Sequence, residues 1–247
     1  MERGIYATAT GMIATQQWMD VVSNNLANAS TVGFKRDSIA FDEAMLREME
    51  VGKRPIGGLG SGPKANQTVT IFERGSLEST GNPLDLSIDS DHGLFAVQTP
   101  AGTRYTRAGD FTLNANRLLV TKSGYPVLDQ QGRQITVPGG QPLVTKDGTL
   151  TVNDSEVARI GVFDCARASK DDLGFRKIGT NLYEALRPVS VMGDAKVQSG
   201  MLEGSNVNAV ESMVQMIAIS RSFELSQKSV MAQDELTQRL IQSLSDR

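Results

Sequence analysis

Apolar residues recur at alternating intervals of four and three positions near the N-terminus. The series has seven positions, five of them apolar: Ile5, Ala9, Met12, Gln16, Met19, Ser23 and Leu26. Positions spaced in this way share one face of an α-helix, and the spacing is that of a coiled-coil seam. The pattern predicts a helix over residues 4–29 with one buried face.

A second series of the same kind occupies the C-terminal segment from residue 206 to residue 244. It combines apolar residues with polar interruptions: Met213, Met216, Ser220, Phe223, Gln227, Val230, Asp234, Thr237, Ile241 and Leu244. Asn206 or Asn208 is suited to cap this helix, and Glu211 falls in its first turn, where the helix dipole favours an acid. Because an isolated helix depends on packing its apolar face, we expect both helices to pack on each other or on other chains.

Turn-forming residues are concentrated between the two helices. All eight prolines fall between Pro55 and Pro188, and no glycine follows Gly204. The short apolar runs between these turns predict strands at 84–88, 94–98, 103–107, 111–113, 118–120, 126–128, 134–137, 149–152 and 158–163. Many short strands with frequent turns are typical of an antiparallel barrel or sandwich.

These elements predict an α+β fold class. We expect the N- and C-terminal helices to pair as a coiled coil and to flank a central, mainly antiparallel β domain of barrel or sandwich type. The expected divisions are an N-terminal helix with its following motif (1–36), an extended linker (37–65), the β-rich domain (66–200) and the C-terminal helix (201–247). The glycine cluster at 57–64 is interpreted as a loop, because Pro63 separates Gly62 from Lys64 and breaks the pattern of a phosphate-binding loop.

Composition removes several function classes. The 247 residues carry a net charge of −3 and only 5% aromatic residues, which argues against a nucleic-acid-binding protein. One histidine, His92, and one cysteine, Cys165, exclude multi-histidine metal sites, zinc sites with two cysteines and internal disulfides. No apolar run is long enough to insert in a membrane, and the N-terminus lacks the apolar core of a cleavable signal peptide.

Candidate catalytic chemistry is confined to one acidic stretch. Asp85, Asp89, Asp91 and His92 could be drawn as an acid–base or metal cluster, since Asp85 and Asp89 would share one face of a strand. We interpret them as a polar strand end and turn before Gly93, and we expect Cys165 to be a buried, inert thiol. The sequence therefore predicts no catalytic residue, no cofactor and no metal.

Three asparagines within five residues mark the end of the first predicted helix. Asn24, Asn25 and Asn28 would be costly there unless their amide groups have partners. Gly33 supplies a helix-stop residue just before Phe34. This helix end therefore presents amide donors and acceptors suited to binding backbone groups or neighbouring helices.

Four segments together resemble the bacterial flagellar rod and hook protein family. The first is residues 24–36, Asn-Asn-Leu-Ala-Asn-Ala-Ser-Thr-Val-Gly-Phe-Lys-Arg, and the second is residues 202–208, Leu-Glu-Gly-Ser-Asn-Val-Asn. Residues 75–88 and the runs 93–97 and 105–111 also match, in family order. The family usually has a glycine where Arg117 stands in the turn at 114–118, so we expect Asn116 to take the left-handed conformation there.

The resemblance implies a structural subunit of the flagellar rod, the driveshaft that transmits torque across the periplasm. Within the family, residues 1–6 and 200–206 are most similar to proximal rod proteins. The implied partners are other rod proteins, further copies of this chain in a helical assembly, and the type III export apparatus, which exports such subunits without cleaving a signal peptide. We expect subunit contacts at the following residues: Ile5, Met12, Met19, Asn24, Asn25, Leu26, Asn28, Thr31, Gly33, Phe34, Gly204, Ser205, Asn206, Val207, Asn208, Met213, Met216, Phe223 and Val230.

Three alternatives remain open at this stage. The first stays within the family, as a distal rod or hook protein, because residues 20–23 and 35–36 also suit the distal rod type. The second is an enzyme acting on peptidoglycan through Asp85 with Asp89 or Asp91. The third is a β-barrel binding module with helical arms, which would stay monomeric and resist proteolysis at its ends, whereas a rod subunit would lose both ends and keep about residues 66–200.

Overall fold

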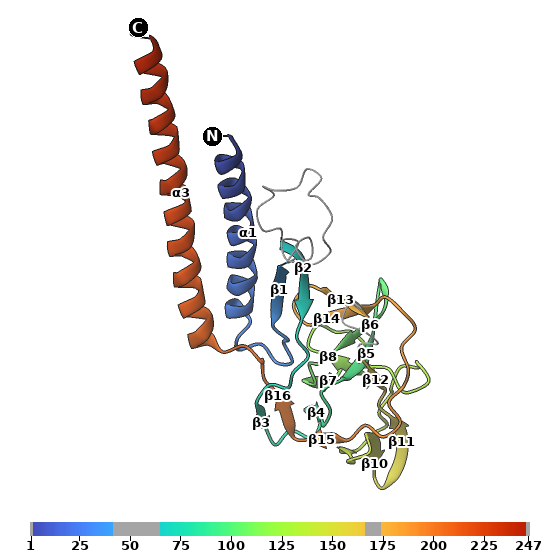
Figure 1. Ribbon diagram of the computed structural model, residues 1–247. Coiled ribbons are helices and arrows are strands. Elements are labelled where there is room, and N and C mark those ends of the chain that lie inside the picture. Colours follow the sequence, from blue (N-terminus) through green and yellow to red (C-terminus); the bar gives the residue numbers. More distant parts are fainter. Residues whose placement is uncertain (1, 42–64, 166–173, 246–247) are drawn as a thin grey trace. The chain divides into compact units, whose positions relative to one another are not determined.

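The computed structural model describes residues 2–41, 65–165 and 174–245, and it divides the chain into two compact units. The first unit contains the two long helices with residues 37–69, and the second contains residues 28–36 and 70–207. Figure 1 shows that both units are built from segments distant in sequence. The glycine cluster at 57–64 lies outside the described residues.

The first unit is built around helices α1, Glu2–Ala27, and α3, Ala209–Ser245, which lie beside each other with opposite chain directions (Figure 1). The α3 helix begins as predicted, because the Asn208 side-chain oxygen accepts hydrogen bonds from the amides of Val210 and Glu211 at 3.1 and 3.2 Å. Strands β1, Asp37–Phe41, and β2, Ala65–Thr70, pair in a two-stranded sheet, so a strand begins the segment predicted to be a linker.

The second unit is a set of small antiparallel sheets. The largest has five strands in the order β12-β5-β6-β14-β13, and a three-stranded sheet has the order β11-β10-β9. Strands β15 and β4, β16 and β3, and β7 and β8 form two-stranded pairs. The strand bounds are β3 Leu77–Ser79, β4 Leu86–Ile88, β5 Gly93–Thr99, β6 Gly102–Thr106, β7 Phe111–Leu113, β8 Leu119–Thr121, β9 Pro142–Val144, β10 Thr149–Val152, β11 Ser155–Arg159, β12 Val162–Asp164, β13 Phe175–Ile178, β14 Leu182–Ala185, β15 Val197–Ser199 and β16 Met201–Glu203.

Two apolar clusters stabilise the second unit. The larger one packs side chains from most of the sheets, including Leu86, Phe95, Val127 and Leu150. The smaller one contains Leu94, Cys165, Phe175 and Tyr183. Because successive residues of a strand point to opposite faces, β5 sends Phe95 into the first cluster and Leu94 into the second. Strand β5 therefore contributes to both clusters and fixes their positions relative to each other.

The α+β class and the antiparallel pairing are confirmed, but of the two expected forms, barrel or sandwich, the described residues do not form a closed barrel. The five-stranded sheet ends at β12 and β13 and does not close on itself. Closure would require β12 and β13 to pair with each other, but among the named strands β12 pairs with β5 and β13 pairs with β14. The run predicted as one strand at 158–163 is two strands, β11 and β12, which belong to different sheets.

The turn at residues 114–118 also differs from expectation. Arg117, and not Asn116, takes the left-handed conformation, with φ of 57°. The guanidinium of Arg117 donates hydrogen bonds to the carbonyl oxygens of Val137, Pro138 and Gly140 at 2.8, 2.7 and 3.2 Å. These bonds stabilise the left-handed conformation at Arg117, which was expected at Asn116 instead.

Candidate functional site

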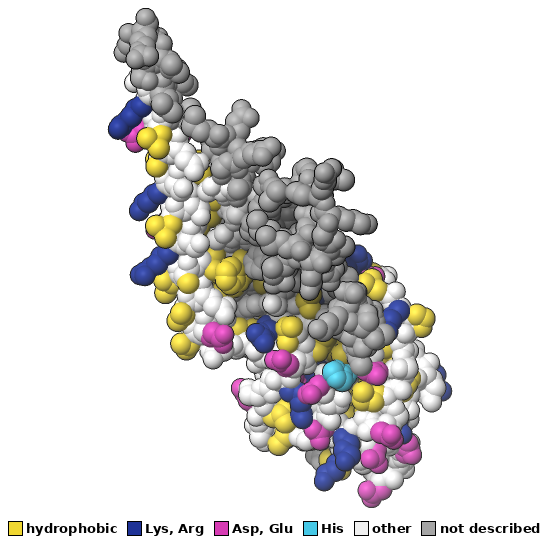
Figure 2. All heavy atoms as spheres, viewed as in Figure 1, with side chains coloured by type: hydrophobic (Ala, Val, Ile, Leu, Met, Phe, Trp, Pro, Cys, Tyr) yellow, Lys and Arg dark blue, Asp and Glu magenta, His cyan; other side chains and the backbone are white. Residues whose placement is uncertain are grey.

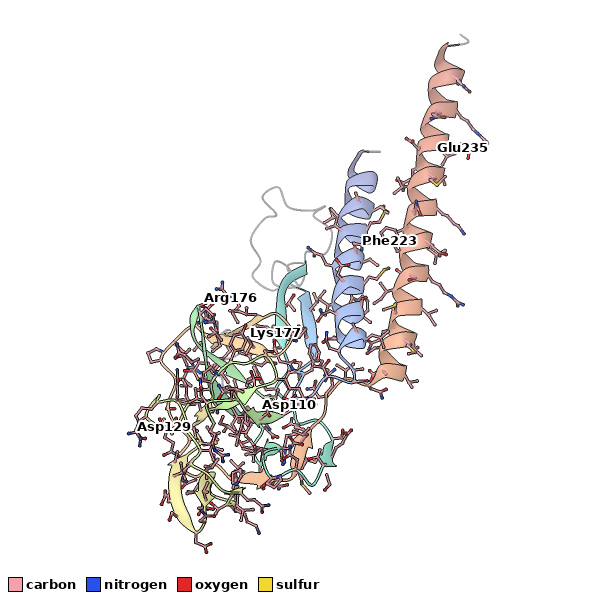
Figure 3. The ribbon with its side chains drawn as sticks, turned by 180° about the vertical axis from the view of Figure 1, so that it is seen from behind. Asp110, Asp129, Arg176, Lys177, Phe223 and Glu235 are labelled. Carbon is pink, nitrogen blue, oxygen red and sulfur yellow. The ribbon has the colours of Figure 1, made fainter. Side chains whose placement is uncertain are left out.

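The inner face of the helix pair has a regular seam. Along α3, six side chains at alternating four- and three-residue spacing are buried or half-buried, at Ser212, Met216, Ile219, Phe223, Ser226 and Val230. Phe223 lies on the side of α3 that faces α1 in Figure 3. On α1, Ala14 and Val22 are buried, with Met12 and Met19 half-buried beside them. Three of the four predicted methionines, Met12, Met19 and Met216, are thus partly covered within a single chain, whereas Met213 is exposed.

The outer face of α3 is also apolar. Val214 is 62% exposed and Leu225 is 67% exposed, and Val210, Met213 and Ile217 are more than half exposed as well. At 3.6 residues per turn, Val214, Ile217 and Leu225 lie on the opposite side of the helix from Ile219. A shallow groove on this side, where Figure 2 shows apolar side chains along α3, is lined by Val214, Ile217, Ala218, Arg221, Ser222 and Leu225. A helix with apolar residues on both faces is suited to burial on both faces.

Two of the predicted asparagines, Asn25 and Asn28, form hydrogen bonds within their own chain. The side-chain amide of Asn25 donates to the carbonyl oxygen of Asp37 at 2.8 Å, and its oxygen accepts from the Asp37 amide at 2.9 Å. Asn25 therefore pairs with the start of β1 as a neighbouring strand would. Asn28 is buried too, and its side chain accepts a hydrogen bond from the Thr31 hydroxyl at 3.2 Å.

The motif at 31–36 and the motif at 203–207 run side by side in the second unit, and we call this region the junction. The Gly33 amide donates to the carbonyl oxygen of Glu203 at 2.7 Å, and the Asn206 amide donates to that of Phe34 at 3.3 Å. The Asn206 side chain accepts from the Arg36 amide at 2.7 Å and donates to the carbonyl oxygens of Ile71 and Glu73. The segments that lead to α1 and α3 are therefore joined by backbone and side-chain hydrogen bonds.

Two glycines allow other backbone segments to pack closely against the junction. A Cβ atom on Gly33, which has φ of 67°, would lie 2.4 Å from the Ala108 nitrogen. A Cβ atom on Gly75 would lie 2.1 Å from the carbonyl oxygen of Gly204. Neither position has room for a side chain, because the neighbouring atoms belong to the backbone.

Strand β13 and the turn that follows it also hold the junction. The Lys177 ammonium lies 3.7 Å from the centre of the Phe34 ring and donates to the carbonyl oxygen of Lys35 at 2.7 Å. Figure 3 labels Lys177 in this region. The Asn181 amide donates to the carbonyl oxygen of Val32 at 3.0 Å. Phe34 itself is fully buried, so its ring is part of this unit's interior.

A buried ion cluster lies at the centre of the junction. The Lys35 ammonium and the Arg107 guanidinium both bind the Glu203 carboxylate, at 2.5 and 2.7 Å. All three side chains are at most 2% exposed. Arg107 also donates to the carbonyl oxygens of Gly93, Ile88 and Ser90, and the Gly75 amide donates to Glu203 at 3.0 Å. The sequence does not reveal this cluster, because its three residues belong to motifs that are far apart in the chain.

The ionisation of the cluster follows from its burial and its charges. Burial lowers the pKa of Lys35 below its ordinary value of 10.5, and the attraction of Glu203 opposes this effect only in part. Burial raises the pKa of Glu203, but Arg107 and Lys35 outweigh it and hold that pKa below its ordinary 4.5. Glu203 is therefore ionised at neutral pH between two basic groups.

Cys165 is a neutral thiol beside this cluster. It is 3% exposed, and burial raises its pKa to about 12 in spite of the positive charge of Arg107. Since a thiolate is the reactive form, this cysteine is unreactive in the folded chain, as the sequence predicts.

The acidic stretch does not form one site. Asp89 pairs with Arg74 at 2.8 Å, whereas Asp85 accepts a hydrogen bond from Asn82 at 3.0 Å. Among the described residues, no group of three or more histidine, cysteine, aspartate or glutamate side chains could hold a metal ion. None of the described helices has an apolar stretch long enough to cross a membrane.

The residues predicted at subunit contacts differ in their exposure. Asn25, Asn28, Gly33 and Phe34 are buried within the chain. The Ile5 side chain lies outside the described part of the structure. Three are exposed, Asn24, Asn208 and Met213, and the rest are half-buried: Met12, Met19, Leu26, Thr31, Gly204, Ser205, Asn206, Val207, Met216, Phe223 and Val230.

Comparison with known proteins gives matches over both terminal motifs and the β-rich region. Residues 5–35 match the family described as flagella basal body rod protein. Residues 90–152 match the flagellar hook protein FlgE/F/G D1 domain, and residues 198–243 match the flagellar basal body rod FlgEFG protein C-terminal region.

Full-length relatives carry the same description. The flagellar basal-body rod protein FlgG of Bacillus subtilis is 34% identical over 265 residues, covering 98% of each chain. The flagellar basal-body rod protein FlgF of Caulobacter vibrioides is 35% identical over 255 residues, covering 99% of this chain and 98% of its own. This chain belongs to the flagellar basal-body rod protein family. It is a structural subunit of the flagellum and not an enzyme, and it assembles with other flagellar axial proteins.

Proposed function

We propose that this rod protein is a subunit of the proximal rod and packs through both faces of α3. The observation that carries the packing is the second apolar face of α3, with Val214, Ile217 and Leu225 more than half exposed. A neighbouring copy or another rod protein covers this face in the assembly, while α1 and α3 of each chain pair as a coiled coil. Contacts between repeated subunits that do not close on themselves generate a helical filament.

The proximal position is supported by residues 1–6 and 200–206, which are most similar to proximal rod proteins. In this proposal the chain passes through the flagellar type III export apparatus and joins the rod in the periplasm. The distal rod is the second candidate, because FlgG and FlgF relatives are about equally similar to the chain.

Purified basal bodies test both parts of the proposal by mass spectrometry. Leu225→Asp places a charge on the outer face of α3 without touching the inner seam, so we expect the folded protein to be absent from basal bodies and the cells to be non-motile. Gln227→Asp adds the same charge at an exposed polar position about 160° around the same helix from Leu225, and it serves as the matched control.

The position of this chain along the rod is tested by mass spectrometry of incomplete basal bodies, purified from a strain that lacks the distal rod protein. A proximal subunit is present in them, whereas a distal subunit is absent. Normal incorporation of Leu225→Asp would contradict the packing role of the outer face. Absence of the chain from the incomplete basal bodies would contradict the proximal position and leave the distal rod or the hook.

A further inference from the structure

The buried ion cluster joins three parts of the chain that are distant in sequence. Lys35 belongs to the loop that follows α1, Arg107 follows β6, and Glu203 ends β16. The paired residues are 168 positions apart for Lys35 and Glu203, and 96 apart for Arg107 and Glu203. The cluster is therefore complete only when the C-terminal segment has reached the junction.

The charges of the cluster are unequal. Two basic side chains converge on one carboxylate, and the ion pairs of Lys35 and of Arg107 in the described part of the chain are both made with Glu203. Backbone carbonyl groups accept their remaining hydrogen bonds, including that of Glu73 from Lys35 and that of Gly93 from Arg107. Without Glu203, two buried cations would be left without a counter-charge, which is among the most unfavourable arrangements in a protein interior.

We propose that Glu203 is a latch that makes closure of the N-terminal motif depend on the C-terminal segment. Residues 31–36 and the loop at Arg107 cannot bury their cations until Glu203 arrives, so the junction closes in one step after all three segments have met. The latch concerns folding within one chain, and it holds whether the subunit is proximal or distal.

The charge imbalance predicts a specific order of stability among variants of the cluster. Removal of the anion leaves two unpaired buried cations, whereas removal of Lys35 leaves a balanced pair of Arg107 and Glu203. Glu203→Gln is therefore expected to lower the folded-to-unfolded ratio by roughly a hundredfold or more, and Lys35→Met by much less. Adding Lys35→Met to Glu203→Gln is expected to restore part of the loss, because one unpaired cation is removed.

Trypsin cleavage of the purified full-length protein tests the latch at Lys35 and Arg107, which are distant from Glu203 in sequence but contact it in the folded chain. Trypsin cuts after lysine and arginine, and Lys35 and Arg107 are 0% and 2% exposed in the folded chain. We expect Glu203→Gln to open both sites, so that cleavage after Lys35 and after Arg107 accelerates together. Urea unfolding of the same variants measures the folded-to-unfolded ratio.

Glu184→Gln is the matched control, because Glu184 also pairs with two basic residues, Arg104 and Arg176, but at a partly exposed site. It is expected to leave both cleavage sites protected, since partly exposed ion pairs contribute little. Protection of Lys35 and Arg107 in Glu203→Gln would overturn the proposal. So would a double variant less stable than Glu203→Gln alone, because that result would describe independent hydrogen bonds and not a charge imbalance.

Discussion

Arg117 shows how a single side chain can hold an unfavourable backbone conformation. Its φ of 57° lies in a region that favours glycine, at a cost on the order of 1 kcal/mol for other residues. The guanidinium group repays part of this cost through its hydrogen bonds to the carbonyl oxygens of Val137, Pro138 and Gly140. These bonds fix the segment that leads into β9.

Substitution of Arg117 separates the two effects. Arg117→Gly relieves the backbone but removes three hydrogen bonds, so we expect a net loss of about 1–2 kcal/mol in the free energy of unfolding. Arg117→Ala loses the same bonds and keeps the strained backbone, so it is expected to be about 1 kcal/mol less stable than the glycine variant. Urea unfolding of the three proteins gives the order, and a glycine variant more stable than the original would contradict the role of the guanidinium.

The expectation for this turn was wrong for a reason that lies outside local sequence. Asparagine tolerates the left-handed region better than arginine does, so Asn116 was the locally reasonable choice. The decisive hydrogen bonds come from carbonyl groups about 20 residues later in the chain, which only the folded unit brings within reach. Local propensity predicts such turns well only where no distant group participates.

At the scale of the element, periodicity predicted both helices, but it predicted the buried seam of α3 only in part. The predicted series passed through Ser220 and Gln227, whereas the buried seam passes through Ile219 and Ser226, one residue earlier at each point. Both series share Met216, Phe223 and Val230. Because α3 is apolar on two faces, its sequence alone does not distinguish the face that packs within the chain from the face left exposed.

Asn25 links two elements of the first unit, the end of α1 and the start of β1. Asn25→Ala removes both hydrogen bonds to Asp37, and we expect it to lower the free energy of unfolding by about 2 kcal/mol. Ser23→Ala, at an exposed position of the same turn, is expected to change it by less than about 0.5 kcal/mol. Thermal unfolding followed by circular dichroism measures both values.

An unchanged melting temperature in Asn25→Ala would show that these bonds contribute nothing to the folded unit. The expected loss of stability in Asn25→Ala also affects how a defect in rod assembly is interpreted for this variant. Since Asn25 is buried in its own chain, a motility defect in this variant reports the fold of the subunit and does not by itself identify a contact between subunits. Exposed positions such as Leu225 test that contact directly.

At the scale of the whole molecule, the ion cluster predicts acid sensitivity. The unfolded chain binds a proton at Glu203 near pH 4.5, whereas the folded chain keeps this carboxyl ionised to lower pH. The stability contributed by Glu203 is therefore complete above pH 4.5 and is lost as the pH falls through its lower folded pKa. Asp129, whose pKa is also held low by hydrogen bonds from Arg133 and Gln131 against the effect of burial, adds a loss of the same sign.

Urea midpoints measured from neutral pH down to about pH 3 test this prediction. In Lys35→Met one attracting charge is gone, so the folded pKa of Glu203 moves back toward 4.5 and the acid-induced loss becomes smaller. A midpoint that stays constant below pH 4.5 would contradict the role of the carboxylate.

The sequence predicted the secondary-structure elements of the molecule better than the contacts between segments that are distant in the chain. The α+β class, both helices and strands such as 111–113 and 149–152 follow from local pattern and are confirmed. The inclusion of residues 28–36 in the unit formed by residues 70–207 does not follow from local pattern. It depends on Lys35, Arg107 and Glu203 meeting across more than 160 residues, and charged residues in a sequence give no sign that they will be buried together.

The position of Cys165 has a consequence for chemical reactivity. It is the only thiol in the 247 residues, and it is buried beside the charged centre of the junction with a pKa of about 12. An alkylating reagent reaches it only while the surrounding structure is open, and only its thiolate reacts. The rate of alkylation of Cys165 therefore measures how often this region opens. The measurement uses the natural sequence and needs no attached label.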